Sequence, residues 1–293
     1  MVESNREAWK RILIFLLINF GLSAVFNYLI ISSGSFRTGR GLYVLGVMWC
    51  PGVAALITCK LCGKSIAELG WGWGKTKYQI ASYLIPFGYA LVAYLAVWLS
   101  GLGGFYNPEF VQSAVRDFHW EGLPTGLVLF LTVLLTGTLG VIRSTGSALG
   151  EEIGWRGFLV PELAKVTSFT NTALISGAVW AVWHYPALLF ADYNAGTPAW
   201  YGLSCFTVMV VGMSFIFAWM RLVSGSLWTA AFLHASHNLF VQAILTPLTV
   251  DTGKTKYFID EFGAALVIVS IIVGYIFWRM RDRLPATGAP SAA

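Results

Sequence analysis

The sequence predicts an all-α, polytopic integral membrane protein with about eight transmembrane helices. Of its 293 residues, 57% are hydrophobic and only 11% are charged, and the mean hydropathy is +0.68. A soluble domain carries about 25% charged residues, so this chain has too few to cover a water-facing surface. Long apolar stretches recur along the chain, and in hydrocarbon such stretches must satisfy their backbone groups as helices.

The apolar stretches lie at about 11–31, 42–61, 79–101, 125–143, 171–191, 201–221, 226–247 and 262–280. Each is near the ~20 residues that an α-helix needs to cross the hydrocarbon core, whereas an outer-membrane barrel would need short strands of alternating polarity. No soluble stretch is long enough for a second domain. We therefore expect one transmembrane domain over residues 1–284, followed by a disordered tail at residues 285–293.

The first stretch follows Arg6, Lys10 and Arg11, as the apolar region of a secretory signal peptide would. It is too long for such a region and no Ala-x-Ala cleavage site follows, so we expect a retained first helix. With eight spans, 14 of the 19 Lys and Arg residues fall on the side of the two termini. The positive-inside rule then places both termini in the cytoplasm. These loops explain the net charge of +5, so the expected partner is the lipid bilayer and not a nucleic acid.

Cys59 and Cys62 have the CxxC spacing of metal and redox sites. No second CxxC pair and no nearby histidine accompanies them, and they lie at the end of an apolar stretch. We interpret them as two unpaired thiols at a helix end.

Polar residues within or beside the spans are informative, because ionisable groups at membrane depth are costly and mark functional sites. The first cluster is Glu151, Glu152 and Arg156. Glu152 and Arg156 are four residues apart, which favours an ion pair, while Glu151 points about 100° away from Glu152. One carboxylate is then neutralised and the other is free to act as a base. The alternative is an ordinary cytoplasmic helix with surface charges.

Two more clusters lie in later spans. Trp180 precedes His184 by four residues inside the fifth apolar stretch, where a lone histidine also bonds readily to a neighbouring helix. His234 and Asn238 are four apart in the seventh stretch and share one helix face. His237 lies on a different face, where a helix contact would explain it.

Together these residues supply the parts of an amide hydrolase. A glutamate deprotonates water, a histidine shares that proton, and a histidine with an asparagine donates to the developing oxyanion. By hydropathy Glu151 lies near the interface, whereas His184 lies about 13 residues into its span, or ~20 Å. The clusters converge only if the fourth helix resumes or tilts inward through residues 144–154 and lines a water-filled cavity.

The combined pattern resembles that of a known family. Glu-Glu-x-x-x-Arg, aromatic-x-x-x-His and His-x-x-x-Asn occur here in the order and spacing of the CAAX-protease and bacteriocin-processing family, also called the Abi family. The resemblance covers a protease core over residues 125–240, and Trp180 stands where the family more usually has Phe. It implies an eight-helix core with a cytoplasm-facing catalytic cavity, in the cytoplasmic membrane of a prokaryote.

The resemblance also implies roles for individual residues. Glu151 and His184 would activate the attacking water, and His234 and Asn238 would hold the oxyanion. Glu152 and Arg156 would organise the site.

A metal is an open point of this expectation. If zinc is bound, Glu151, His184 and His234 are the possible ligands, because Glu and His both coordinate zinc. The sequence lacks the HExxH helix of zincins. We favour the glutamate-dependent mechanism without a catalytic metal.

The leading hypothesis is thus an endopeptidase that acts on a peptide or membrane-protein substrate, and the sequence leaves its natural substrate and oligomeric state open. The alternative is a non-catalytic bacteriocin-immunity or scaffold protein that keeps the motifs as a structural network. A proton-coupled carrier would use Glu151 and the histidines as a relay, but it would be expected to show inverted repeats. The sequence has no such symmetry.

Overall fold

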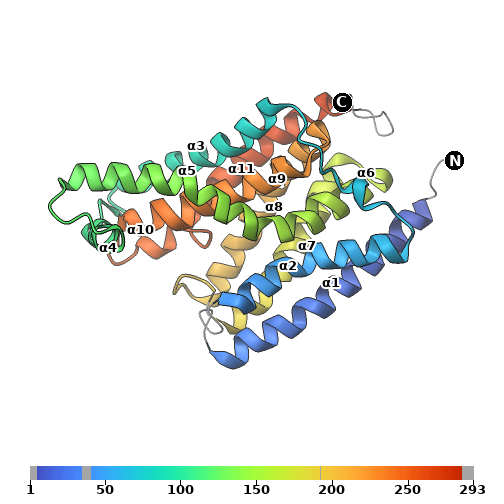
Figure 1. Cartoon of the computed structure of the whole chain (residues 1–293), viewed down its shortest axis with the longest axis horizontal. Helices are drawn as coiled ribbons and strands as arrows, with labels where there is room; N and C mark the ends of the chain where they lie inside the picture. The colour runs from blue at the N-terminus through green and yellow to red at the C-terminus, as the bar shows by residue number, and fades with distance from the viewer. Residues whose placement is uncertain (1–4, 35–40, 192, 286–293) are drawn as a thin grey trace.

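The computed structural model describes residues 5–34, 41–191 and 193–285, and they form a helical bundle (Figure 1). Six helices in this part of the chain are long and apolar enough to cross a membrane. They are α1 (Asn5–Ser33), α2 (Leu42–Leu61), α3 (Thr76–Leu99), α5 (Thr125–Glu152), α7 (Phe169–Phe190) and α8 (Ala199–Ser224). The expectation of an all-α, polytopic membrane protein is confirmed. The disordered tail, apart from Pro285, lies outside the described residues.

The two remaining expected spans coincide with shorter elements. One is α9 (Leu227–Asn238), which continues as the π-helix η4 (Leu239–Leu245) into the short α10 (Thr246–Leu248). The other is α11 (Ala264–Arg279), a 16-residue apolar helix. The described residues therefore give six helices of spanning length, and the expected count of eight is not confirmed.

Small elements connect the long helices. The 3-10 turn η2 (Ile66–Leu69) follows α2, η5 (Thr255–Tyr257) precedes α11, and η6 (Arg281–Arg283) follows it. The strands β1 (Gly104–Phe105) and β2 (Thr249–Val250) form one antiparallel pair, with Gly104 opposite Val250. Between β1 and α5 lies α4 (Pro108–Phe118), an amphipathic helix that packs Val111 and Ala114 against Val128. Such helices suit a membrane interface.

Helix α5 is longer than its hydropathy predicts. The expected end near residue 143 is wrong, because α5 continues to Glu152 and passes without a break into the π-helix η3 (Ile153–Leu159) and α6 (Val160–Val166). Arg143, Ser144 and Ser147 lower the hydropathy of this segment because they line a cavity and do not form a loop. The inward continuation that the clusters require is therefore present. Segments of π-helix are frequent at functional sites.

Helix α2 packs closely against the segment that carries the paired carboxylates. A Cβ atom on Gly154 would lie 2.4 Å from Cβ of Pro51, and one on Gly150 would lie 2.7 Å from Cγ of Trp49. Small residues four apart let membrane helices approach each other closely. These two glycines therefore fix the position of the carboxylate pair relative to α2.

One end of the bundle is held by a buried ion cluster. Glu162 of α6 receives Nε of Arg11 at 2.8 Å, Nζ of Lys165 at 2.8 Å and Nζ of Lys64 at 3.3 Å. A buried carboxylate needs such partners to offset its lost hydration. The cluster ties α1, α6 and the segment after α2 together. At this end α1 begins and α11 finishes, whereas α4 and α10 lie at the opposite end (Figure 1).

Candidate active site

The three motifs meet at one cavity of about 650 Å³ inside the bundle. Its walls include Glu151 from α5, His184 from α7, and His234 and Asn238 from α9. Trp180 of α7 completes this part of the wall. The structure thus brings together the four residues that the sequence assigns to the chemistry.

Glu151 is buried, with 2% of its surface exposed, and it is oriented by two indoles. Its Oε2 accepts a hydrogen bond from Nε1 of Trp180 at 2.8 Å and a longer one from Nε1 of Trp155 at 3.3 Å. No hydrogen bond joins Oε1 to any residue that the structure describes. Phe at position 180, which the resembling family usually has, would have no N–H to donate. The sequence analysis missed Trp155, although its spacing of four residues from Glu151 is a signal for a contact on one helix face.

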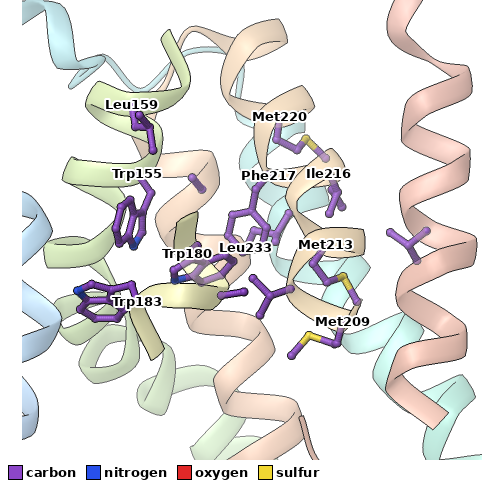
Figure 2. Close-up of a cluster of buried hydrophobic side chains, with 14 of the residues drawn as sticks. Trp155, Leu159, Trp180, Trp183, Met209, Met213, Ile216, Phe217, Met220 and Leu233 are labelled. Atoms are coloured by element: carbon purple, nitrogen blue, oxygen red, sulfur yellow. The ribbon is translucent and has the colours of Figure 1, made fainter. Parts of the chain in front are cut away.

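Glu152 is paired as the sequence predicts. Nη1 of Arg156 lies 2.9 Å from its Oε1 and 3.2 Å from its Oε2, and Nδ1 of His234 lies 2.9 Å from the same Oε1. The guanidinium group lies between two aromatic rings, 4.1 Å from the ring centre of Trp180 and 4.0 Å from that of Phe217. Figure 2 shows these two rings beside Trp155 in the buried cluster. All of these groups are buried, so the pair is held in a fixed arrangement.

His184 is oriented by its own helix. Its Nδ1 lies 2.9 Å from the carbonyl oxygen of Trp180, one turn earlier. A carbonyl only accepts, so Nδ1 carries the hydrogen and Nε2 is left as an acceptor in the neutral ring. The ring also packs edge-on against Trp183, with centroids 4.7 Å apart, and against Phe206 at 4.9 Å. These contacts fix the plane of the imidazole.

His234 and Asn238 present different chemistry to the cavity. The carboxylate of Glu152 accepts from Nδ1 of His234, so Nε2 is the ring atom available to a substrate. This is the orientation that a carboxylate gives to the histidine of a hydrolytic triad. The side-chain amide of Asn238 makes no hydrogen bond with a described residue and lies on the cavity wall. It is therefore free to donate to a bound group.

A second polar cluster on the cavity wall was not predicted. His237 bonds through Nδ1 to the hydroxyl of Tyr89 and through Nε2 to Oε1 of Glu261 at 3.2 Å. The hydroxyl of Tyr193 donates to Oε2 of Glu261 at 2.9 Å. Tyr193, His237 and Glu261 all line the cavity. We expected His237 to make a helix contact, and its bond to Tyr89 of α3 is such a contact. Its bond to Glu261, which lies in a connecting segment, was not expected.

The environment of Glu261 favours its charged form. Burial acts to raise its pKa, but the hydrogen bonds from His237 and Tyr193 outweigh burial and hold the pKa below its usual value. For the adjacent Asp260, burial and the charge of Glu261 raise the pKa to about 7. The signal in the sequence is two neighbouring carboxylates just before an apolar helix, the pattern that drew attention to residues 151 and 152. The sequence analysis did not use Asp260 and Glu261, because they lie between two apolar stretches and not within one.

The cavity lies between the middle of the bundle and the end away from Asn5. Its α2 wall is formed by Val44, Val47 and Met48, which belong to the first half of that helix, away from Lys60 and from the ion cluster around Glu162. The segments that connect α7 to α8 and η5 to α11 supply Tyr193 and Glu261 from the same end. The cavity and the Lys- and Arg-rich end are therefore on different sides of the bundle.

The possible zinc ligands do not form a metal-binding group. Among the described residues, no set of three or more His, Cys, Asp and Glu side chains is arranged to hold a metal ion. The expectation of zinc at Glu151, His184 and His234 is not supported by this geometry.

Comparison with known proteins agrees with the motifs. Residues 127–240 match the model of the Rce1-like family of type II CAAX prenyl endopeptidases. The chain is also 30% identical over 190 residues to CAAX prenyl protease 2 of Methanococcus maripaludis. This alignment covers 63% of this chain and 61% of that protein. The matched part thus spans about three fifths of the relative. The part of the chain that carries the three motifs is thus similar to the Rce1-like CAAX prenyl endopeptidases.

Proposed function

We propose that the protein is an intramembrane endopeptidase that hydrolyses a peptide bond of a membrane-associated or lipidated peptide or protein. The observation that carries the proposal is the pairing of a buried carboxylate with a histidine on one cavity wall. Glu151 and His184 both line this cavity. Each is oriented by bonds that leave one acceptor atom, Oε1 or Nε2, without a partner in the described chain. A water molecule held by these two acceptors is placed for general-base catalysis.

In the proposed reaction Glu151 takes a proton from this water as the water oxygen bonds to the carbonyl carbon of the substrate. The carbonyl oxygen becomes negatively charged, and the amide of Asn238 donates to it. His234 also donates to it through Nε2–H when its ring is an imidazolium, a form that the carboxylate of Glu152 stabilises. The C–N bond then breaks as the proton passes to the leaving amine, and a new carboxylate and a free amine result.

The substrate class follows from the location of the site and from the relative. The cavity lies within helices that are long and apolar enough to span a membrane, so a substrate must be able to enter the bilayer. Most of the cavity wall is apolar and includes Met209, Met213 and Phe217, which suit a lipid chain or an apolar peptide. The name of the relative, CAAX prenyl protease 2, points to lipidated substrates.

The expected orientation and the expected cytoplasm-facing cavity do not fit together. Arg143 belongs to α5 and not to a loop, yet the remaining Lys and Arg residues still favour the end where α1 begins. We keep both termini in the cytoplasm on this ground and place the cavity in the outer half of the membrane. The test is a cysteine at Ser147 in a chain without its native thiols. It should react with a membrane-impermeant reagent added outside intact cells, and reaction only from the cytoplasmic side would contradict this orientation.

The immunity or scaffold reading is favoured by one observation, the fully buried Glu152–Arg156–His234 network. Such a network would also hold a bundle together without catalysis. The protease and the scaffold protein are distinguished by the effect of Glu151→Gln on cleavage and on the amount of folded protein. Loss of cleavage with unchanged amounts of folded protein supports the protease, whereas an unchanged biological effect supports the scaffold.

A further inference from the structure

The side-chain amide of Asn238 has no hydrogen bond of its own to orient it within the described chain, although it lines the cavity. Asn238 is the last residue of α9, and the π-helix η4 begins at Leu239, so the helical path changes directly after it. A donor to an oxyanion acts well only when it is fixed in place before the reaction. The direction of this amide therefore depends on what holds the end of α9.

The two residues of α9 ahead of His237 are bonded to neighbouring helices. The carbonyl oxygen of Ala235 accepts a hydrogen bond from Oγ of Ser144 of α5 at 3.0 Å. Oγ of Ser236 donates to the carbonyl oxygen of Tyr83 of α3 at 2.6 Å. These bonds hold α9 on the sides of α5 and α3, and its bond to the segment before α11 is made by His237.

His237 is held at both of its ring nitrogens. Nδ1 is bonded to the hydroxyl of Tyr89 of α3, and Nε2 lies 3.2 Å from Oε1 of Glu261. A carboxylate only accepts, so Nε2 carries the hydrogen, and Nδ1 of the neutral ring accepts from the tyrosine hydroxyl. All three side chains are buried. A rotation of the ring would break both bonds, so the residue before Asn238 is clamped between α3 and a connecting segment.

Glu261 is itself held by its surroundings. Its Oε2 accepts from the hydroxyl of Tyr193, which lies in the segment between α7 and α8, at 2.9 Å. Its backbone N–H donates to Oδ1 of Asp260 at 2.7 Å. The carboxylate therefore reaches His237 from a point that is fixed independently of α9.

We propose that Glu261 is a positioning residue that holds Asn238, through His237, where the oxyanion forms. This inference rests on the proteolytic function proposed above. The printed bonds of Glu261 reach neither Glu151 nor His184, so its effect on the chemistry passes through His237. A misplacement of about 1 Å can cost about a hundredfold in rate. Because the oxyanion exists only in the transition state, loss of the clamp should lower kcat and leave KM nearly unchanged.

The test is a double-mutant cycle of Glu261 and Asn238 on the cleavage of a fluorogenic membrane-anchored peptide. Asn238→Ala removes the donor and should lower kcat by about a hundredfold. Glu261→Gln replaces one acceptor oxygen with an N–H₂ donor and should lower kcat by roughly tenfold, with KM within about twofold of wild type. In the Asn238→Ala protein the same change should have less than about a threefold effect, because the donor that Glu261 positions is gone. Asp251→Asn, an exposed carboxylate of the same connecting segment, is the matched control and should leave kcat unchanged.

Equal effects of Glu261→Gln with and without Asn238 would overturn the proposal and leave the protease intact, since Glu261 would then act independently of the amide. If Glu261→Gln does not fold, Tyr89→Phe removes the bond on the other side of His237 and enters the same cycle with the same expected coupling.

A second measurement needs no cleavage. A trifluoromethyl label is attached to Asn238→Cys in a chain without its native thiols, and its ¹⁹F NMR spectrum is recorded in detergent. One narrow resonance that broadens or splits when Glu261→Gln is added supports the clamp, even if wild type cleaves no peptide and the proteolytic function fails. A spectrum that Glu261→Gln leaves unchanged would overturn the proposal.

Discussion

Trp180 donates its indole N–H to Oε2 of Glu151 across the contact between α7 and α5, at 2.8 Å. The same ring covers the guanidinium of Arg156 at 4.1 Å and packs against the ring of His234 with centroids 5.5 Å apart. One side chain therefore touches the proposed base, the cation that neutralises its neighbour and the proposed oxyanion donor. The contact makes Trp180 a positioning residue for Glu151.

The Trp180→Phe variant should fold and should lose activity. Phe keeps the ring packing but removes the donor to a charged oxygen, a contact worth about 1.5–3 kcal/mol. We expect kcat to fall by about tenfold or more while KM changes little, as measured on a fluorogenic peptide. Trp219→Phe is the matched control, because its indole donates to the carbonyl oxygen of Met280 and not to Glu151. An equal loss of kcat in both variants would contradict the positioning role.

Removing Arg156 should destabilise the bundle more than removing the whole ion pair. Arg156→Met leaves the buried carboxylate of Glu152 with His234 as its remaining partner, and breaking a buried pair in this way costs about 3–5 kcal/mol. The double variant Glu152→Gln/Arg156→Met should recover part of this loss. Thermal unfolding in detergent measures all three proteins. If the double variant is no more stable than Arg156→Met, the carboxylate is not the cause of the instability.

The contact between α2 and the glycines beside Glu151 and Glu152 should tolerate no added methyl group. Gly154→Ala places a Cβ within 2.6 Å of the Pro51 backbone, and such overpacking costs about 1–3 kcal/mol. Gly146→Ala on the same chain segment is the control, since no atom lies within 4 Å of its Cβ position. The melting temperature should fall for the first variant and stay level or rise for the second. Equal melting temperatures would show that α2 moves away without loss.

Stability should depend on the protonation of Asp260. Burial raises its pKa from 3.8 to about 7 in the folded protein, so the folded state retains a proton that the unfolded chain releases at lower pH. The stabilisation is full below pH 3.8 and is lost as the pH rises towards 7. We expect Asp260→Asn to flatten the change in melting temperature between pH 5 and pH 8, roughly the upper part of this window. A parallel pH profile in both proteins would assign the dependence to other groups.

Sequence patterns predicted the helices, the Glu152–Arg156 pair and the convergence of four residues on one cavity. Spacing along a single helix was enough for the ion pair, because residues four apart must share a face. The convergence was inferred from the chemistry that the clusters have in common, and the condition on it, a longer fourth helix, is met by α5. Hydropathy placed the end of this helix too early, because the polar residues of the cavity wall lower the mean hydropathy as a loop would.

The remaining features of the site depend on contacts between residues far apart in the sequence, which the spacing of residues within one helix does not predict. The bond from Nδ1 of His234 to Glu152 joins residues 82 positions apart, and that from His237 to Glu261 joins α9 to a connecting segment. The π-helices after Glu152 and Asn238 have no distinct residue pattern. Trp155 was within reach of the reasoning, since it stands four residues after Glu151.

The central claim is that Glu151 activates the water that cleaves the peptide bond. Its most direct test is the rate of cleavage of a fluorogenic prenylated peptide and a set of membrane-anchored peptides by detergent-purified wild type and Glu151→Gln, each with and without a chelator. Glu109→Gln, an exposed glutamate of α4, is the matched control. The account predicts cleavage by wild type and the control, and a loss of at least about a hundredfold in Glu151→Gln, the lower part of the range for a general base. Cleavage by a folded Glu151→Gln protein at the wild-type rate would contradict it.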